Sequence, residues 1–207
     1  MEGTAGDPVL NNITLVNPSF ESGDPPDGWI YRNSTQVSRV SDAKVGSYAL
    51  KYEYPGGGSY PYVVTNQTFN ITEWAGKTVT VGAWVKSTHA STRLGFMEWG
   101  GAWWSTGSYH PGDGEWHWLR CTATIPASLT ANWTIGVVNY NTTASYTFWF
   151  DDVVLAENAV FEVGSFDIGN YTLDITNLKS TTSYRIRAFG ENDNGISYGN
   201  TVTCQTR

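Results

Sequence analysis

The chain has 207 residues, of which 15% are charged and 14% aromatic, and its formal net charge is -7 at pH 7. This negative charge, with no cluster of Lys and Arg, argues against a nucleic-acid partner because phosphates would be repelled. No apolar run reaches the roughly 18–20 residues that cross a bilayer, so we expect no membrane insertion. Helical periodicity is absent, and we predict an all-β protein.

Residues 1–10 are predicted to be an N-terminal arm that lacks the basic and apolar segments of a signal peptide. Residues 11–157 have the short strands and polar turns of one large domain, a β-sandwich or a β-barrel. Its predicted strands are Ile13–Val16, Gln36–Val40, Ala49–Tyr54, Tyr62–Thr68, Thr78–Ser87, Thr92–Glu98, Trp116–Ile125, Trp133–Asn139 and Tyr146–Leu155.

Two of these strands alternate in the way that half-buried strands do. Along Thr78–Ser87, one side carries Val79, Val81, Ala83 and Val85. Along Trp116–Ile125, the core side carries Leu119, Cys121, Ala123 and Ile125, which leaves Trp118 and Arg120 on the opposite face. A tryptophan that faces outward needs a physical explanation.

The segment from Trp99 to His110 combines three Trp and one Tyr with several glycines, and we predict a flexible aromatic loop. Flat sugar faces stack on exposed aromatic rings, so the pattern favours glycan binding. The candidate ligand-binding residues are Trp84, Trp99, Trp103, Trp104, Tyr109, Trp118, Tyr60 and Tyr62, with Glu98 and Arg120 as polar partners. Two alternatives stay open: some of these rings fill the core, or the loop anchors another protein.

The stretch from His110 to His117 holds two His and two carboxylates around a Gly-Asp-Gly turn. It lacks an established metal-ligand spacing, and we interpret it as a hairpin.

Residues 158–207 form a second, smaller unit with predicted strands at Phe161–Phe166, Tyr171–Leu178, Ser183–Glu191 and Ile196–Gln205. Cys121 and Cys204 lie in different units, so the sequence leaves two possibilities, buried thiols or a bridge between the units.

Residues 11–157 resemble the family 4/9/22-type carbohydrate-binding modules. The resemblance rests on the opening residues 15–23 followed by Asp27-Gly28-Trp29, on residues 43–50, on Thr78–Lys86, on Gly114-Glu115-Trp116, and on residues 147–155. It implies a jelly-roll sandwich in which Trp29, Trp116 and Trp149 occupy core positions.

The same resemblance implies a structural calcium ion. Its ligands would be Glu21 and Asp151, joined by Asp152 and by backbone carbonyls between Lys44 and Gly46. Hard oxygen ligands suit calcium, and such an ion would tie the first strand to the last. The alternative is that Glu21 and Asp151 are solvated carboxylates at strand ends.

Residues of about 160–207 resemble the second half of a fibronectin type III domain, on residues 171–178, 181–188 and 192–199. The first half is missing, so the resemblance implies an incomplete immunoglobulin/fibronectin-like β-sandwich. Its open side must be covered by the large domain or by another chain, and we favour self-association or another chain.

An enzyme is not predicted. Asp151 and Asp152 are adjacent in a strand, so alternation would point them to opposite faces, and no nucleophile elbow or phosphate loop occurs. We predict a non-catalytic glycan-binding or adhesion module that is extracellular, on a cell surface or on a virion. The alternative is a structural assembly protein, such as a virion decoration, tail or filament subunit.

Overall fold

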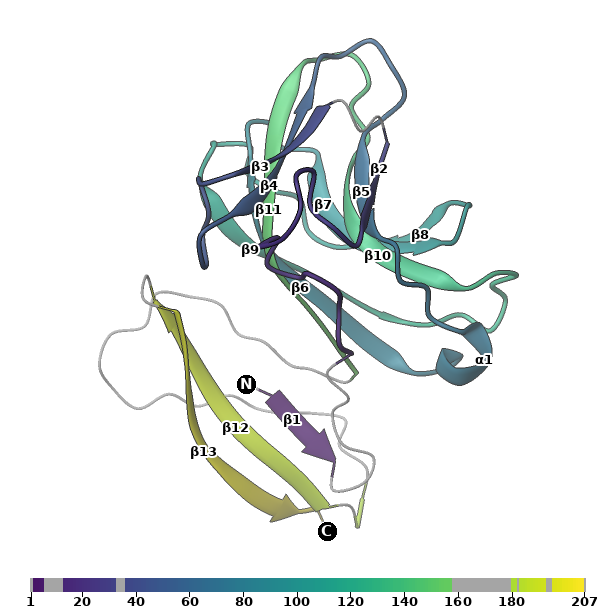
Figure 1. Cartoon of the computed structure of the whole chain (residues 1–207). Helices are drawn as coiled ribbons and strands as arrows, with labels where there is room; N and C mark the ends of the chain where they lie inside the picture. The colour runs from purple at the N-terminus through teal and green to yellow at the C-terminus, as the bar shows by residue number, and fades with distance from the viewer. Residues whose placement is uncertain are drawn as a thin grey trace.

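The computed structural model describes residues 2–5, 13–32, 36–157, 180–181, 183–192 and 195–206. The large domain is a jelly-roll β-sandwich of two five-stranded antiparallel sheets that face each other (Figure 1). The first, called the β2–β8 sheet, contains in spatial order β2 (Trp29–Tyr31), β5 (Tyr62–Thr65), β10 (Trp133–Asn139), β7 (Thr92–Glu98) and β8 (Trp103–Thr106). The second, called the β3–β9 sheet, contains β3 (Val37–Val40), β4 (Ala49–Tyr54), β11 (Tyr146–Glu157), β6 (Thr78–Ser87) and β9 (Trp116–Thr124). The all-β prediction is confirmed.

Alternation decides which side chains lie between the sheets. On β6, Val79, Val81, Ala83 and Val85 are completely buried, as the sequence predicts, while Trp84 and Lys86 on the other face are half-buried. On β9, Leu119 and Cys121 are buried and Arg120 is exposed. The period of two therefore holds in both strands.

Some predicted elements differ from the structure. The expected strand Ile13–Val16 is not formed, although the Ile13 N–H donates to the Leu155 carbonyl at 3.0 Å. Strands β2 and β8 were not predicted, because β2 has three residues and β8 lies within the expected loop. The single helical turn α1 (Ile71–Trp74) is too short to show periodicity and is capped by the Asn70 side chain.

Aromatic rings fill much of the space between the sheets. Phe20, Trp29 and Phe150 form one cluster, with ring centroids 5.0–5.4 Å apart. The prediction of a core position is confirmed for Trp29 and is wrong for Trp116 and Trp149, which are half-buried and lie outside the core cluster. Trp149 points outward because its neighbours Phe148 and Phe150 take the core face of β11.

A separate three-stranded sheet contains β1 (Glu2–Ala5), β12 (Ser183–Asn192) and β13 (Gly195–Gln205), in that order. Strands β12 and β13 match two predicted strands, whereas Phe161–Phe166 and Tyr171–Leu178 lie outside the described residues. Part of the predicted arm is thus a strand, since Glu2 to Ala5 pair antiparallel with β12. The fibronectin-like half domain stays a prediction.

Both cysteines are free thiols, with Cys121 buried and Cys204 partly exposed, so the alternative of a bridge between them is not realised. No helix within the described ranges is long and apolar enough to span a membrane.

Candidate functional site

The candidate ligand-binding residues do not form one site. Tyr60, Tyr62, Trp103 and Tyr109 lie on the outer face of the β2–β8 sheet, and Trp84, Trp118 and Arg120 belong to the outer face of the β3–β9 sheet. Trp104 turns inward, and Trp99 and Glu98 lie at the end of β7.

The outer face of the β2–β8 sheet carries an almost continuous group of rings and guanidinium groups. We call it the aromatic strip and define it as Arg32, Tyr60, Tyr62, Arg93, Trp103, Tyr109 and Tyr140. The ring centroids of Tyr60 and Tyr140 are 5.1 Å apart, those of Tyr60 and Tyr62 6.3 Å, and those of Tyr62 and Trp103 6.4 Å.

Strand pairing places the strip on the outer face. Tyr62 on β5 and Arg93 on β7 both pair with Val138 on β10, so these three side chains point the same way. Their strand neighbours Val63 and Leu94 point into the core, where both are completely buried. Three distant sequence segments thus meet in one cross-strand row.

The base of the strip is packed. Val64 and Val138 on the outer face lie outside the core cluster, yet they are only 1% and 0% exposed. Trp103 reaches over Gly95, where a Cβ atom would stand 3.0 Å from the Trp103 ring. Packed bases hold the rings in fixed positions, which lowers the entropy that a ligand must remove on binding.

Each guanidinium group of the strip lies over two tyrosine rings. The Arg93 guanidinium carbon is 4.5 Å from the Tyr109 centroid and 4.7 Å from that of Tyr140. The Arg32 guanidinium carbon is 5.1 Å from the Tyr60 centroid and 5.5 Å from that of Tyr62. Tyr109 is 59% exposed and Tyr140 37% exposed, so this end of the strip is open to solvent.

The sequence analysis missed Arg32, Arg93 and Tyr140. Arg93 lies within the predicted strand Thr92–Glu98, and Tyr140 directly follows the predicted strand Trp133–Asn139. Alternation along a single strand does not show which residues of two different strands become neighbours. The alternation of strand residues could have placed Arg93 on the outer face, because Arg93 directly precedes Leu94 and neighbouring residues of a strand point to opposite faces.

The outer face of the β3–β9 sheet carries tryptophan rings next to lysine side chains. Trp84 and Trp118 pair across β6 and β9 with ring centroids 5.6 Å apart, and the Lys44 ammonium lies 4.7 Å from the Trp84 centroid. Trp149 lies between Lys51 and Lys86, at 5.9 Å and 4.8 Å. Lysine ammonium groups therefore lie over rings of this face, as arginine guanidinium groups lie over rings of the aromatic strip.

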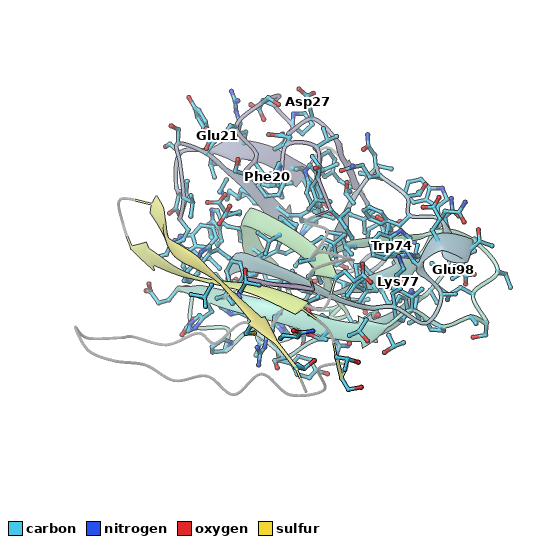
Figure 2. The ribbon with its side chains drawn as sticks, turned by 90° about the horizontal axis from the view of Figure 1, so that it is seen from below. Phe20, Glu21, Asp27, Trp74, Lys77 and Glu98 are labelled. Carbon is cyan, nitrogen blue, oxygen red and sulfur yellow. The ribbon has the colours of Figure 1, made fainter. Side chains whose placement is uncertain are left out.

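The remaining candidates have local roles. Trp104 stacks on the core residue Phe96, with centroids 5.2 Å apart, so for this residue the core alternative is correct. One carboxylate oxygen of Glu98 accepts from Thr130 N and Oγ1 and from Ala131 N, at 2.6–2.8 Å, and these bonds lower the pKa of Glu98. Figure 2 shows Glu98 far from Glu21, at another end of the sandwich.

The predicted calcium ligands Glu21 and Asp151 both contact the turn of residues 44–48. Asp151 Oδ2 accepts from Lys44 N and Val45 N, each at 2.9 Å, and Glu21 Oε1 accepts from Ser47 N and Tyr48 N at 2.8 Å and 3.1 Å. A Cβ atom at Gly46 would come within 2.3 Å of Glu21 Oε1. Lys44 contacts Asp151 through its backbone N–H group, whereas the expected calcium ligands in this turn were backbone carbonyls.

Asp151 is a completely buried carboxylate, and burial raises its pKa to about 7. None of the ion pairs in the described part of the chain includes it. A cation would compensate this charge, so the site suits calcium in that respect. Glu21, Asp151 and Asp152 do not gather as three metal-ligating side chains among the residues that the structure describes, so other oxygens would have to complete the coordination.

Asp152 does not follow the regular alternation assumed from the sequence. The pairing of β11 with β6 shifts between Asp151 and Val154, and Asp152 has a φ of 46°. Its N–H donates to Asp151 Oδ1 at 2.7 Å. The two carboxylates therefore sit at a β-bulge, and the argument that they point to opposite faces of a regular strand does not apply.

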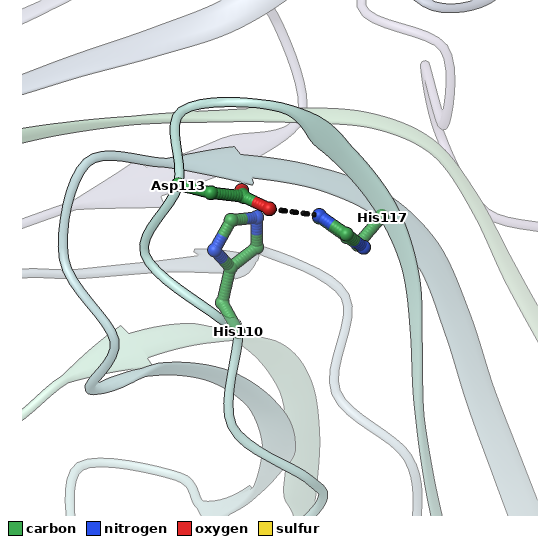
Figure 3. Close-up of side chains that lie close together, drawn as sticks. All are labelled: His110, Asp113 and His117. Carbon is green, nitrogen blue, oxygen red and sulfur yellow. Dashed lines mark hydrogen bonds and ion pairs between the residues drawn. The ribbon is translucent and has the colours of Figure 1, made fainter.

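His110 and Asp113 from the turn before β9 and His117 from β9 itself lie close together (Figure 3), each offering a ligand atom within 4.8 Å of the others. Gly112 N–H donates to His110 Nδ1 at 2.8 Å, which leaves the proton of the neutral ring on Nε2, facing the Glu115 carbonyl at 3.1 Å. Coordination through Nε2 requires the other tautomer, with its proton on Nδ1. The cluster therefore has the hydrogen bonds of a structured turn. The predicted hairpin is wrong, because this turn leads from β8 in one sheet to β9 in the other, and the two strands pair with β7 and β6 instead of with each other.

No protein-family model and no curated protein matches the chain. Among solved structures, an arabinose-bound α-L-arabinofuranosidase aligns with 75% of this chain and 28% of its own, at 15% identity and a TM-score of 0.56. A Stig cyclase from Fischerella sp. TAU aligns with 72% of this chain and 98% of its own, at 13% identity and a TM-score of 0.51. The carbohydrate-binding module TmCBM61, solved with β-1,4-galactotriose, aligns with 68% of this chain and 95% of its own, at 21% identity and a TM-score of 0.46.

Identities this low establish a shared fold and nothing about a ligand. The arabinofuranosidase and the cyclase are enzymes, so a shared fold by itself does not decide whether this chain is catalytic.

Proposed function

We propose that this protein is a non-catalytic glycan-binding module and that the aromatic strip is its binding surface. The observation that carries the proposal is the row of tyrosine and tryptophan rings with packed bases and partly exposed faces on the β2–β8 sheet. Sugars present flat C–H faces and hydroxyl groups, which suit rings and guanidinium donors.

The composition of the strip favours binding over catalysis. It contains only Tyr, Trp and Arg, which are not the residue types that usually act as general acids or bases at neutral pH, and burial raises the pKa of Tyr140 further. A catalytic role would need a carboxylate, His or thiol placed against the bound sugar.

The test compares two tryptophans on opposite outer faces. The Trp103→Ala variant removes a ring of the strip, and the Trp118→Ala variant removes a half-buried ring of the β3–β9 sheet. Binding is measured by affinity electrophoresis and isothermal titration on a panel of polysaccharides. We expect Trp103→Ala to weaken binding by about tenfold or more and Trp118→Ala to leave it within about twofold.

Equal losses in both variants, each with an unchanged melting transition, would contradict the assignment of the strip. Failure of the folded wild-type chain to bind any glycan would contradict the function itself.

We further propose that calcium binds between Glu21 and Asp151 and ties the turn of residues 44–48 to β11. The buried charge of Asp151 supports this proposal. Calcium should raise the melting temperature above that in EDTA, and the increase should disappear in Asp151→Asn. An increase that persists in this variant would place the ion elsewhere.

The alternative function, subunit assembly, rests on the three-stranded sheet. The sequence predicts that this sheet has open edges without partner strands. One edge is covered within the chain, because β1 pairs with β12. Sedimentation over a range of concentrations tests this alternative, and a strict monomer would contradict it. Adhesion from an extracellular, cell-surface or virion position is the setting that we propose for a glycan-binding role.

A further inference from the structure

We infer that the glycan bound by the aromatic strip is acidic and carries uronate carboxylates. This inference rests on the proposed function, because it names the chemical class of the ligand for the same surface. It is carried by Arg32 and Arg93, which the strip holds in place and which have no carboxylate partner within the described part of the chain.

Acidic residues outnumber Lys and Arg by 19 to 12, so acids are plentiful in this chain. Two lysines of the sandwich pair with them, Lys51 with Glu53 and Lys86 with Asp42, both at 2.9 Å. Among the described residues, Arg93 has no such pair, and its buried Nε atom has no hydrogen-bond partner.

The rings hold each guanidinium group close to the sheet surface. The guanidinium carbon of Arg93 lies over the rings of Tyr109 and Tyr140, at 4.5 Å and 4.7 Å from their centroids. The N–H groups of a guanidinium lie in its plane. A carboxylate is flat as well and accepts two such N–H groups in parallel, so it is the anion that suits a guanidinium group best.

The strip presents this arrangement twice. Arg32 lies over Tyr60 and Tyr62. The ring centroids of Tyr60 and Tyr140 are 5.1 Å apart, and these two tyrosines connect the position of Arg32 with that of Arg93. The strip thus has two positions for a carboxylate, connected by a pair of tyrosine rings. A matching ligand is a polymer that repeats a carboxylate and a flat apolar face. A uronate polysaccharide has a flat sugar face and a carboxylate in each acidic unit.

The net charge of -7 would repel a uronate polymer as it would repel phosphates, but the structure brings together two arginines that are far apart in the sequence. Charges separated by more than about 8 Å are largely screened at physiological ionic strength, so the local pair of arginines decides the interaction.

The experiment uses the full chain and matched pairs of probes. Oligomers of galacturonate and of alginate are compared by isothermal titration with their carboxyl-reduced counterparts, which keep the sugar ring and lose the charge. We expect the acidic member of at least one pair to bind about tenfold or more tightly. Increasing NaCl should weaken the binding of the acidic member.

Variants assign the effect to the arginines. We expect Arg93→Gln and Arg32→Gln each to weaken binding of the acidic oligomer by about tenfold. Binding of the neutral oligomer should change by less than about threefold. Arg93→Lys keeps the charge without the planar group and should recover only part of the loss. Arg39→Gln is the matched control, since Arg39 also lies over a tyrosine, Tyr48 at 4.2 Å, outside the strip.

The outcomes separate the two proposals. Neutral oligomers that bind as tightly as acidic ones overturn the uronate assignment and leave glycan binding intact. Preference for a sulfated glycan over uronate oligomers also overturns it. Folded protein that binds neither member of any pair, nor any neutral polysaccharide, refutes glycan binding itself.

Discussion

Ionisation of Asp151 should make the folded protein less stable as the pH rises from about 4 to about 8. The carboxylate is completely buried, and burial raises its pKa from 3.8 to about 7. Between these two values the folded protein holds a proton that the unfolded chain has released. The stabilisation is therefore complete below about 3.8 and is lost as the pH rises through about 7.

The magnitude follows from the difference between the two pKa values. Each unit corresponds to about 1.4 kcal/mol, which gives about 4 kcal/mol as the largest change in the free energy of unfolding. Three backbone N–H donors hold the ionised carboxylate in place, from Lys44, Val45 and Asp152. We expect a measured change of about 2–4 kcal/mol.

Urea unfolding of the wild type and of Asp151→Asn in EDTA isolates this contribution, because the other carboxylates titrate equally in both proteins. The free energy of the wild type relative to the variant should fall across this pH range. Glu53→Gln is the control: Glu53 has a 62% exposed side chain in a surface ion pair, so its difference from wild type should stay nearly constant.

The measured quantity is the free energy of unfolding of the wild type minus that of Asp151→Asn. If this difference stays constant or rises with pH, burial does not raise the pKa of Asp151. If calcium binds as proposed, adding it should reduce or reverse the fall, since the ion favours the ionised carboxylate.

Three further predictions concern the sandwich. Gly136→Ala should destabilise the protein by about 3 kcal/mol or more in urea unfolding, because a Cβ would stand 2.0 Å from the Val63 carbonyl oxygen in the centre of the sheet. Gly58→Ala is the control, since its Cβ meets only the Tyr54 hydroxyl at 3.6 Å. Equal losses of stability in the two variants would contradict the close packing at Gly136. Phe148→Ala should cost about 3–5 kcal/mol and change the near-ultraviolet circular dichroism, because the completely buried ring stacks on Tyr52 at 5.1 Å; a loss below about 1 kcal/mol would show that the site is not packed this way. Under native conditions a thiol reagent should modify Cys204 and spare Cys121, since burial shields the Cys121 thiol and raises its pKa; rapid reaction of both thiols would contradict the burial of Cys121.

Strand alternation is the part of the fold that the sequence predicted best. The order of apolar and polar residues on β6 is enough to separate Val81 and Val85 from Trp84, because a strand has a period of two whatever its neighbours are. The same rule would have placed Trp149 outside, opposite Phe148 and Phe150. The family resemblance placed Trp149 in the core, and the alternation of the strand is the better guide.

The calcium ligands and the ligand-binding residues were chosen from motifs along the chain, and the structure divides them among separate places. The expected aromatic loop is partly the strand β8, which brings Trp103 over Gly95 and turns Trp104 toward Phe96. Neighbouring residues in a strand face opposite sides, so two adjacent tryptophans of similar appearance have different roles.

The sequence by itself determined the fold class and the side of each long strand that is buried, since both depend on local alternation and turn residues. Only the tertiary structure decided which strands are neighbours. That order puts Tyr62 of β5 and Arg93 of β7 on either side of Val138, about thirty residues apart along the chain. Strand order depends on packing between distant segments, and the strip exists only because that packing aligns their outer faces.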